Sequence, residues 1–328
     1  MNYIVQKYGG TSVNTKEKRQ NIINNVKEVI SEGCMPVVVV SAMGRFPESY
    51  ATDSLLGLVG DNPVDKRSLD LLSSLGENIT TVVVSAELNA AGIPAMPLTG
   101  YQAGILTDEN FGEGNILSIN TSRLEENAKN GVVSVVAGFQ GMSETGEILT
   151  LGRGGSDTTA CALGGALKAK RVEIFSDVDG VFTADPKISA KARLLEKIKF
   201  EDIFRLADCG AKVIHPRAVL HAMKANVPIH ALNVGKKRGS DCTVISDIEK
   251  SPSFFAITSK KGEERDTVTI LFDEELICEN CCDVIRNILG EMKEEYFDYV
   301  RENSSVVFTI NKGNAQDVVK NIHDALIY

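Results

Sequence analysis

Short apolar runs rich in Val and Ile alternate along the chain with longer segments whose apolar residues recur at helical spacing. The first pattern is typical of strands and the second of amphipathic helices. The strands predicted in this way are residues 2–7, 36–41, 93–98, 132–137, 171–176 and 228–233. The predicted helices are residues 15–31, 64–75, 77–91, 121–130, 156–168, 200–208 and 216–225. The polar, glycine-rich residues 138–155 are expected to form turns.

The order of these elements predicts the fold class. Strands that alternate with helices form a mainly parallel sheet with helices on both faces, so we expect an α/β fold. The run PVVVVS at 36–41 has no polar alternation, which suits a strand buried on both faces. Ligands of such sheets bind beyond the carboxyl ends of the strands. Polar residues directly after predicted strands are therefore the first candidates for a site.

The pattern changes after residue 234. Residues 235–253 contain Gly, Lys, Asp, Ser and Pro and are expected to form a linker. Further along, FFAITS, TVTILF and SVVFTI predict strands, and residues 279–293 and 314–326 predict helices. We therefore predict a large domain at 1–234 and a small α+β domain at 254–328.

Composition and charge narrow the function classes. The chain has 328 residues, of which 43% are hydrophobic and 24% charged, as is typical of globular proteins. Its net charge of −9 argues against a nucleic-acid partner, which would require a basic surface. No apolar run approaches the roughly 18 residues of a membrane helix, and we expect neither a signal peptide nor a membrane partner. The expected location is the cytoplasm.

The seven cysteines indicate reduced thiols rather than a disulfide framework. Cys278, Cys281 and Cys282 are close enough together to form half of a metal site. No second pair at ligand spacing follows them, and no His is adjacent. We therefore favour a helix in this segment and predict no metal bound by protein ligands.

The first motif that could take part in binding or catalysis is KYGGTS at 7–12, between the first strand and a helix. Gly9 and Gly10 allow the backbone to approach a ligand closely, and successive N–H groups at such a turn form an anion-binding concavity. Lys7 adds a positive charge. The spacing is not that of a Walker A loop. An ordinary Gly-Gly turn with a solvated Lys remains the alternative for this segment alone.

The second motif is LGRGGSDTTA at 151–160, before a helix that Ser156 or Asp157 could cap. An Arg beside a glycine-rich helix start can hold a carboxylate or a phosphate with two hydrogen bonds. Capping explains Asp157 but leaves Arg153, with its three neighbouring glycines, unexplained. A functional role is therefore favoured here.

Two weaker motifs follow. SDVDGVFTADPK at 176–187 comes directly after a strand, although DVDG is also a common turn. GAKVIHP at 210–216 contains Lys212, which could be a second phosphate ligand or a partner for a helix C-terminus. We expect His215 to be structural, because no acidic or nucleophilic partner is near it in the sequence.

Together these motifs resemble the amino-acid kinase family, and within it the aspartokinases. The resemblance spans about the first 234 residues. It includes the four motifs above and, in addition, VVVSAMG at 38–44, ATD at 51–53, GEN at 76–78 and GFQG at 138–141. The resemblance implies the amino-acid kinase fold, ATP and Mg²⁺ as cofactors with Mg²⁺ carried by ATP, and transfer of phosphate to the β-carboxylate of L-aspartate.

The resemblance also implies the site residues. The ATP-binding residues would be Lys7, Gly9, Gly10, Ser12, Ser176, Asp177, Phe182, Lys187 and Lys212. The substrate-binding residues would be Ser41, Thr52, Glu77, Arg153 and Asp157. Lys7, Lys212 and Asp157 are the expected catalytic residues. Arg153 would hold the α-carboxylate, and Glu77 and Asp157 would face the ammonium group. The family often has Tyr at the position of Phe182 and Arg at that of Lys187.

The C-terminal residues 254–328 resemble, more weakly, one ACT domain of the aspartokinases. Such a domain implies either regulation by an amino-acid effector or a role in dimerisation, and a homodimer or higher homo-oligomer is expected. Acetylglutamate, glutamate or uridylate kinase is the alternative within the same fold. An amino-acid sensor without catalytic activity is the alternative from a different class.

Overall fold

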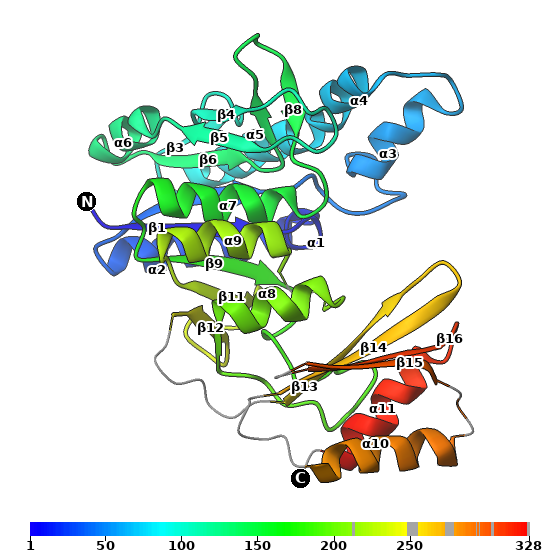
Figure 1. Cartoon of the computed structure of the whole chain (residues 1–328). Helices are drawn as coiled ribbons and strands as arrows, with labels where there is room; N and C mark the ends of the chain where they lie inside the picture. The colour runs from blue at the N-terminus through cyan, green and yellow to red at the C-terminus, as the bar shows by residue number, and fades with distance from the viewer. Residues whose placement is uncertain are drawn as a thin grey trace. The chain divides into compact units, whose positions relative to one another are not determined.

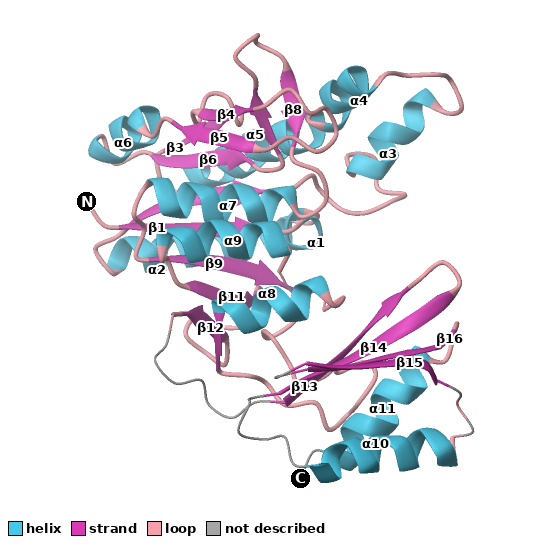
Figure 2. Cartoon of the chain, in the orientation of Figure 1, coloured by secondary structure: helices cyan, strands magenta, loops and turns pink. Residues whose placement is uncertain are grey.

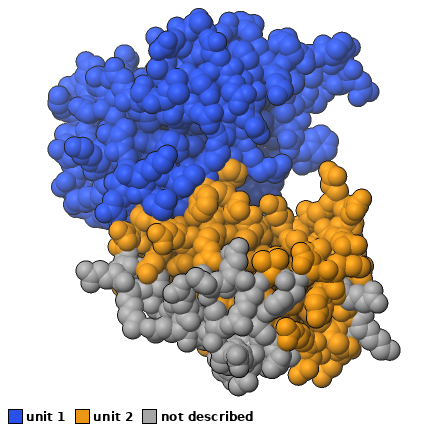
Figure 3. Space-filling view, in the orientation of Figure 1, with its two compact units in different colours: residues 1–179, 217–241 blue, residues 180–216, 242–328 orange. Residues whose placement is uncertain are grey.

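The structure is a computed structural model that describes residues 1–211, 214–247, 255–272, 279–292, 294, 296–302 and 305–326. These residues form two compact units, shown in two colours in Figure 3. Residues 1–179 and 217–241 make up the first unit, and residues 180–216 and 242–328 the second. The chain thus passes from the first unit to the second after Asp179, returns at Arg217 and passes to the second unit again after Asp241.

A parallel sheet forms the centre of the first unit (Figure 1). Its strands lie in the order β11-β9-β1-β2-β6-β3. They are β1 (Tyr3–Tyr8), β2 (Met35–Val40), β3 (Ala95–Leu98), β6 (Val133–Ala137), β9 (Arg171–Ser176) and β11 (Ile229–Asn233). The apolar side chains of β1, β2 and β6 are almost completely buried. Their β-branched residues explain both the strand conformation and the burial on both faces.

Helices cover both faces of this sheet, as Figure 2 shows. The helix α7 (Gly155–Ala166) packs on β1, β2 and β9. Packing on β2, β3 and β6 is provided by α2 (Lys16–Ser31) and α5 (Leu75–Ala90). The remaining helices of the unit are α1 (Gly10–Val13), α3 (Thr52–Leu56), the 3₁₀ helix η1 (Gly57–Val59), α4 (Lys66–Ser73), α6 (Ser122–Lys129) and α9 (Pro216–Ala225). The predicted helices and strands of residues 1–234 are confirmed within two residues at each end.

A second, small sheet in the first unit was not predicted. It has the order β5-β4-β7-β8 and consists of β4 (Ile105–Thr107), β5 (Ile116–Ile119), β7 (Gln140–Met142) and β8 (Ile148–Thr150). The expectation that residues 138–155 form only turns is therefore wrong. Strands of three or four residues carry too little alternation to be distinguished from the polar turns around them. The end of β8 leads directly into the Arg153 motif.

The second unit contains a four-stranded antiparallel sheet with the order β13-β14-β16-β15. Its elements are β13 (Phe255–Lys261), β14 (Arg265–Phe272), α10 (Glu279–Glu291), β15 (Tyr296–Glu302), β16 (Ser305–Asn311) and α11 (Ala315–Leu326). The buried core of this module includes Ile270, Phe308 and Ile322, together with Ala184 of the SDVDGVFTADPK segment. The expected C-terminal α+β architecture is confirmed.

The second unit also contains β10 (Lys197–Lys199), α8 (Phe200–Asp208) and β12 (Thr243–Ser246). The strands β10 and β12 pair in parallel, and Ile198 and Ile245 are buried. The segment 235–253, expected to be a linker, therefore includes a paired strand. Of the cysteine cluster, Cys281 and Cys282 lie in α10, whereas Cys278 lies outside the described residues.

Candidate active site

Lys7 and Asp157 form an ion pair in the first unit, with 2.7 Å between the ammonium and a carboxylate oxygen. Lys7 is near the end of the central strand β1, and Asp157 is in the first turn of α7. Both side chains are about seven-eighths buried, with exposed fractions of 13% and 14%. On the opposite face of the sheet, the Tyr8 ring stacks on Phe175 with 4.7 Å between ring centroids, which fixes the end of β1. The ion pair with Asp157 therefore places the Lys7 ammonium beside the first turn of α7.

The Gly9-Gly10 pair connects β1 to α1. A Cβ atom at Gly10 would lie 2.6 Å from the carbonyl oxygen of Ala42 and 2.7 Å from that of Gly44. Because both atoms belong to the backbone, no larger residue fits without moving the loop after β2. Gly10 lines the cavity described below, whereas Gly9 and Ser12 are outside its lining. The Ser12 hydroxyl is buried and has no hydrogen-bond partner among the described residues.

The helix α7 begins at Gly155, with Gly154 as N-cap at φ 71°. No side chain caps this helix, so the expectation that Ser156 or Asp157 serves as cap is wrong. The Ser156 hydroxyl instead lies 3.0 Å from the hydroxyl of Ser41, at the end of β2. The Gly155 N–H donates to the Gly152 carbonyl at 3.0 Å. Because no side chain caps the helix, the N–H groups of Ser156 and Asp157 are available for an anion.

Glu77, on the first turn of α5, is the most strongly perturbed acid of the site. Its side chain is 3% exposed, and Oε1 accepts a hydrogen bond of 3.0 Å from the Ala42 N–H. Burial raises the pKa of Glu77 to about 8, although the Ala42 N–H favours the ionised form. The second oxygen, Oε2, has no partner among the described residues. A buried carboxyl with one free oxygen beside a cavity is suited to an ammonium group.

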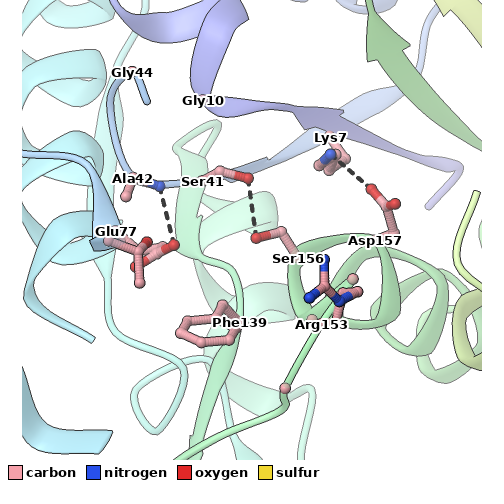
Figure 4. Close-up of a pocket in the computed structure, with 14 residues that line it drawn as sticks. Lys7, Gly10, Ser41, Ala42, Gly44, Glu77, Phe139, Arg153, Ser156 and Asp157 are labelled. Atoms are coloured by element: carbon pink, nitrogen blue, oxygen red, sulfur yellow. Dashed lines mark hydrogen bonds and ion pairs between the residues drawn. The ribbon is translucent and has the colours of Figure 1, made fainter. Parts of the chain in front are cut away.

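These groups surround one cavity of about 280 Å³ (Figure 4). Of the residues predicted for the site, Lys7, Gly10, Ser41, Thr52, Glu77, Arg153 and Asp157 line it. The Arg153 side chain is exposed, in the turn between β8 and α7. The five predicted substrate-binding residues thus share one cavity, although they come from four separate segments of the chain.

Besides four glycines, three lining residues were missed by the sequence reasoning: Ala42, Phe139 and Ser156. Ser156 lies inside the LGRGGSDTTA motif, and Phe139 lies between the glycines of GFQG, so both were close to recognised signals. Phe139 has φ 69°, a conformation that is unfavourable for a bulky residue. Its backbone is fixed by hydrogen bonds to the Thr159 hydroxyl and to the Leu151 N–H. This strained residue forms part of the cavity wall.

The predicted nucleotide residues are distributed over both units. Ser176 ends β9 in the first unit, and its hydroxyl exchanges hydrogen bonds with the backbone of Val178; the adjacent Asp177 is exposed. Phe182 is half-buried in the second unit and forms a β-bridge with Leu194. Lys187 is exposed in the second unit. Lys212 lies outside the described residues.

The fold is that of an amino acid kinase. The sequence profile of the amino acid kinase family matches residues 2–233, and the chain belongs to this family. It is similar to aspartokinases in particular. It is 50% identical over 231 residues to aspartokinase 1 of Bacillus subtilis, a match that covers 70% of this chain and 57% of the relative. With the aspartokinase of Geobacillus stearothermophilus the identity is 46% over 231 residues, covering 70% and 56% of the two chains.

Solved structures show the same similarity. Aspartate kinase from Synechocystis matches with a TM-score of 0.64 and 32% identity, over 98% of this chain and 55% of that chain. Escherichia coli aspartokinase III, solved with aspartate and ADP, matches with a TM-score of 0.70 and 22% identity, over 95% and 79%. The present chain spans little more than half the length of the first curated relatives it matches.

The described part of the chain has two further properties. In it, none of the helices has the length and apolar character needed to cross a membrane. The same residues contain no group of three or more His, Cys, Asp or Glu side chains placed to hold a metal ion.

Proposed function

We propose that this protein is an aspartate kinase, which transfers the γ-phosphoryl group of MgATP to the β-carboxylate of L-aspartate. The observation that carries the proposal is the charge pattern of the cavity. Arg153, Glu77 and the Lys7–Asp157 ion pair line one space. A cation for a carboxylate and acids for an ammonium are complementary to an α-amino acid, and Lys7 provides a further cation for an anionic group.

Each residue has a distinct role in this proposal. The guanidinium of Arg153 binds the α-carboxylate through two parallel hydrogen bonds. Glu77 accepts the ammonium group on its free oxygen and becomes ionised, with Asp157 nearby. The hydroxyls of Ser41 and Thr52 complete the polar lining. A dicarboxylate without an ammonium group would lack the ion pair with Glu77 and would bind more weakly.

The chemistry requires no general base. A carboxylate has an ordinary pKa near 4 and is already ionised at pH 7, so it can attack phosphorus directly. The obstacle is the approach of two anions and the charge on the transferred phosphoryl group. Lys7, the N–H groups of the Gly9-Gly10 turn and the N-terminus of α7 oppose this repulsion with fixed positive charge and dipoles. Catalysis is then positioning combined with preorganised electrostatics.

The nucleotide and its metal complete the proposal. Mg²⁺ enters bound to the ATP phosphates, where it neutralises part of their charge. Lys7, Gly9, Gly10, Ser12, Ser176, Asp177, Phe182, Lys187 and Lys212 are proposed to bind ATP, and Lys7, Lys212 and Asp157 are proposed to be catalytic. The support for these roles is the motif pattern and the similarity to aspartokinases.

The remaining proposals concern the whole protein. Residues 1–234 are proposed to be the catalytic domain and 254–328 an ACT-like domain for regulation or dimerisation. A cytoplasmic homo-oligomer that serves the formation of aspartate-derived amino acids, such as lysine, threonine and methionine, is proposed from the resemblance of the motifs to those of aspartokinases.

Aspartate-dependent formation of ADP from MgATP tests the function. We expect turnover with L-aspartate, and little with L-glutamate, N-acetylglutamate or UMP. Turnover with one of the latter instead of aspartate would indicate another kinase of the same fold. An amino-acid sensor would bind aspartate without forming ADP. Lysine and threonine, added singly and together, test the regulatory role of residues 254–328.

A further inference from the structure

Two charged side chains that do not line the cavity hold the segment that leads into Arg153. The first is Arg217, on α9, which is half-buried. Its Nη1 donates a hydrogen bond of 2.8 Å to the Leu151 carbonyl. Its Nη2 donates to the carbonyl of Gly114 at 2.9 Å and to Oδ1 of Asn115 at 2.8 Å. The guanidinium thus joins the 108–115 loop to the residue two positions before Arg153.

The second is Asp70, on α4, whose side chain is only 2% exposed. Its Oδ1 accepts a hydrogen bond of 2.6 Å from the Thr150 hydroxyl. Its Oδ2 accepts from the backbone N–H of Thr150 at 3.0 Å and from that of Gly112 at 2.9 Å. Like Arg217, this carboxylate joins the 108–115 loop to the end of β8.

The two sets of contacts meet at one short backbone segment. Gly114 donates to the Thr150 carbonyl at 2.8 Å, and Gly152 has φ 69° beside the carbonyl of Gly112. Residues 150–152 are therefore held from both sides. The Arg153 side chain itself makes no hydrogen bond or ion pair to any described residue. The contacts at 150–152 therefore fix the backbone position from which the Arg153 side chain extends.

We propose that Arg217 and Asp70 are positioning residues for Arg153. They fix the backbone at 150–152 so that the Arg153 guanidinium meets the substrate carboxylate in the orientation needed for two parallel hydrogen bonds. The inference rests on the proposed function for the role of Arg153 in substrate binding. The backbone constraint itself does not depend on which substrate is bound.

The test uses the full-length protein and the variants Arg217→Met and Arg217→Lys. Methionine keeps the apolar length of the side chain, and lysine keeps the charge but cannot bridge three acceptors in a fixed plane. The matched control is Arg67→Met on α4, which removes a cation paired with Glu147 at the surface. Two readouts are measured: hydrogen exchange of the amides at 151–155, and steady-state kinetics with each variant in wild-type and Arg153→Ala backgrounds.

We expect both Arg217 variants to exchange the amides at 151–155 faster, by about tenfold, whereas the control exchanges them at the wild-type rate. The KM for the amino acid should rise about tenfold in Arg217→Met with kcat within about twofold, because a misdirected Arg153 loses ground-state contacts. In the Arg153→Ala background the same change should have no further effect on KM. Unchanged exchange at 151–155, or an equal KM effect in both backgrounds, overturns the inference.

Asp70 provides an independent check. In Asp70→Asn the amide oxygen can accept from both backbone N–H groups while the NH₂ group donates to the Thr150 hydroxyl, so exchange should stay near the wild-type rate. Asp70→Ala leaves the two backbone N–H groups and the Thr150 hydroxyl buried without this partner, so hydrogen exchange at 151–155 should become faster. Equal exchange in the two variants overturns the role of Asp70. If the wild-type protein forms no ADP with any amino acid, the proposed function fails, and the exchange data still decide the backbone constraint.

Discussion

The raised pKa of Glu77 predicts that aspartate binding depends on pH between 6 and 8. Burial raises this pKa from 4.5 to about 8. A substrate ammonium pairs with the ionised carboxylate, so the binding-competent fraction of free protein increases as pH rises towards 8. With a pKa of about 8, roughly one molecule in a hundred is ionised at pH 6 and half are ionised at pH 8. The KM for aspartate should therefore fall by about fiftyfold over this range.

The matched variant is Glu77→Gln, which is neutral at every pH and can still accept the Ala42 hydrogen bond. It should bind aspartate weakly and without this pH dependence. Calorimetry gives a second readout, because wild-type Glu77 should release close to one proton when aspartate binds at pH 7. A wild-type KM that is constant from pH 6 to 8, or a Glu77→Gln variant with the wild-type pH profile, would refute the role assigned to Glu77.

The same pKa predicts a change in stability without substrate. Between pH 4.5 and 8 the folded protein keeps the Glu77 proton and the unfolded chain loses it, so the free energy of unfolding falls as pH rises. The rise from 4.5 to about 8 corresponds to at most about 5 kcal/mol, reached above pH 8. Glu77→Gln avoids this loss and should have the higher Tm at pH 8, with the difference disappearing near pH 4.

Other substitutions test the remaining parts of the site. Lys7→Ala should lower kcat by a factor that corresponds to roughly 2.7–4 kcal/mol of transition-state stabilisation, with the exposed Lys16→Ala as control; near-normal turnover would contradict the role of Lys7. Arg153→Ala should chiefly raise the aspartate KM, and an unchanged KM would remove Arg153 from the substrate site. Gly10→Ala must displace the backbone at Ala42 or Gly44 and should lower kcat/KM by at least about tenfold. Wild-type kinetics in Gly10→Ala would show that the loop at Ala42 and Gly44 can move without lowering kcat/KM.

The sequence predicts the central sheet well because its strands have a strong local signal. The runs in β1, β2 and β6 are β-branched and buried on both faces, so local propensity and tertiary environment agree. The short strands β7 and β8 lack such a signal and depend on pairing with each other for their conformation. Edge strand β15 was missed because its sequence YFDYVRE mixes aromatic and charged residues without clear alternation.

The features of the candidate site also differ in how well the sequence predicts them. Lys7, Arg153 and Asp157 lie in motifs that are recognisable within a few residues, so the sequence suffices to propose them. The pKa of Glu77 depends on burial by segments far away in the chain, which no local pattern encodes. Arg217 contacts the Leu151 carbonyl across 66 positions, and only the folded chain reveals this relation. The motif residues of the site can therefore be recognised from the local sequence, whereas the pKa of Glu77 and the contacts of Arg217 depend on the fold.

In the proposed function, the charges of the cavity explain how an acidic protein would attract anionic substrates. The chain carries a net charge of −9, yet Lys7 and Arg153 together outweigh Asp157 in the cavity while Glu77 keeps its proton. With Glu77 protonated, the four groups sum to one positive charge. Ionisation of Glu77 then accompanies arrival of the ammonium group, and the positive charge of the ammonium keeps the sum at one positive charge around the two carboxylates of the substrate.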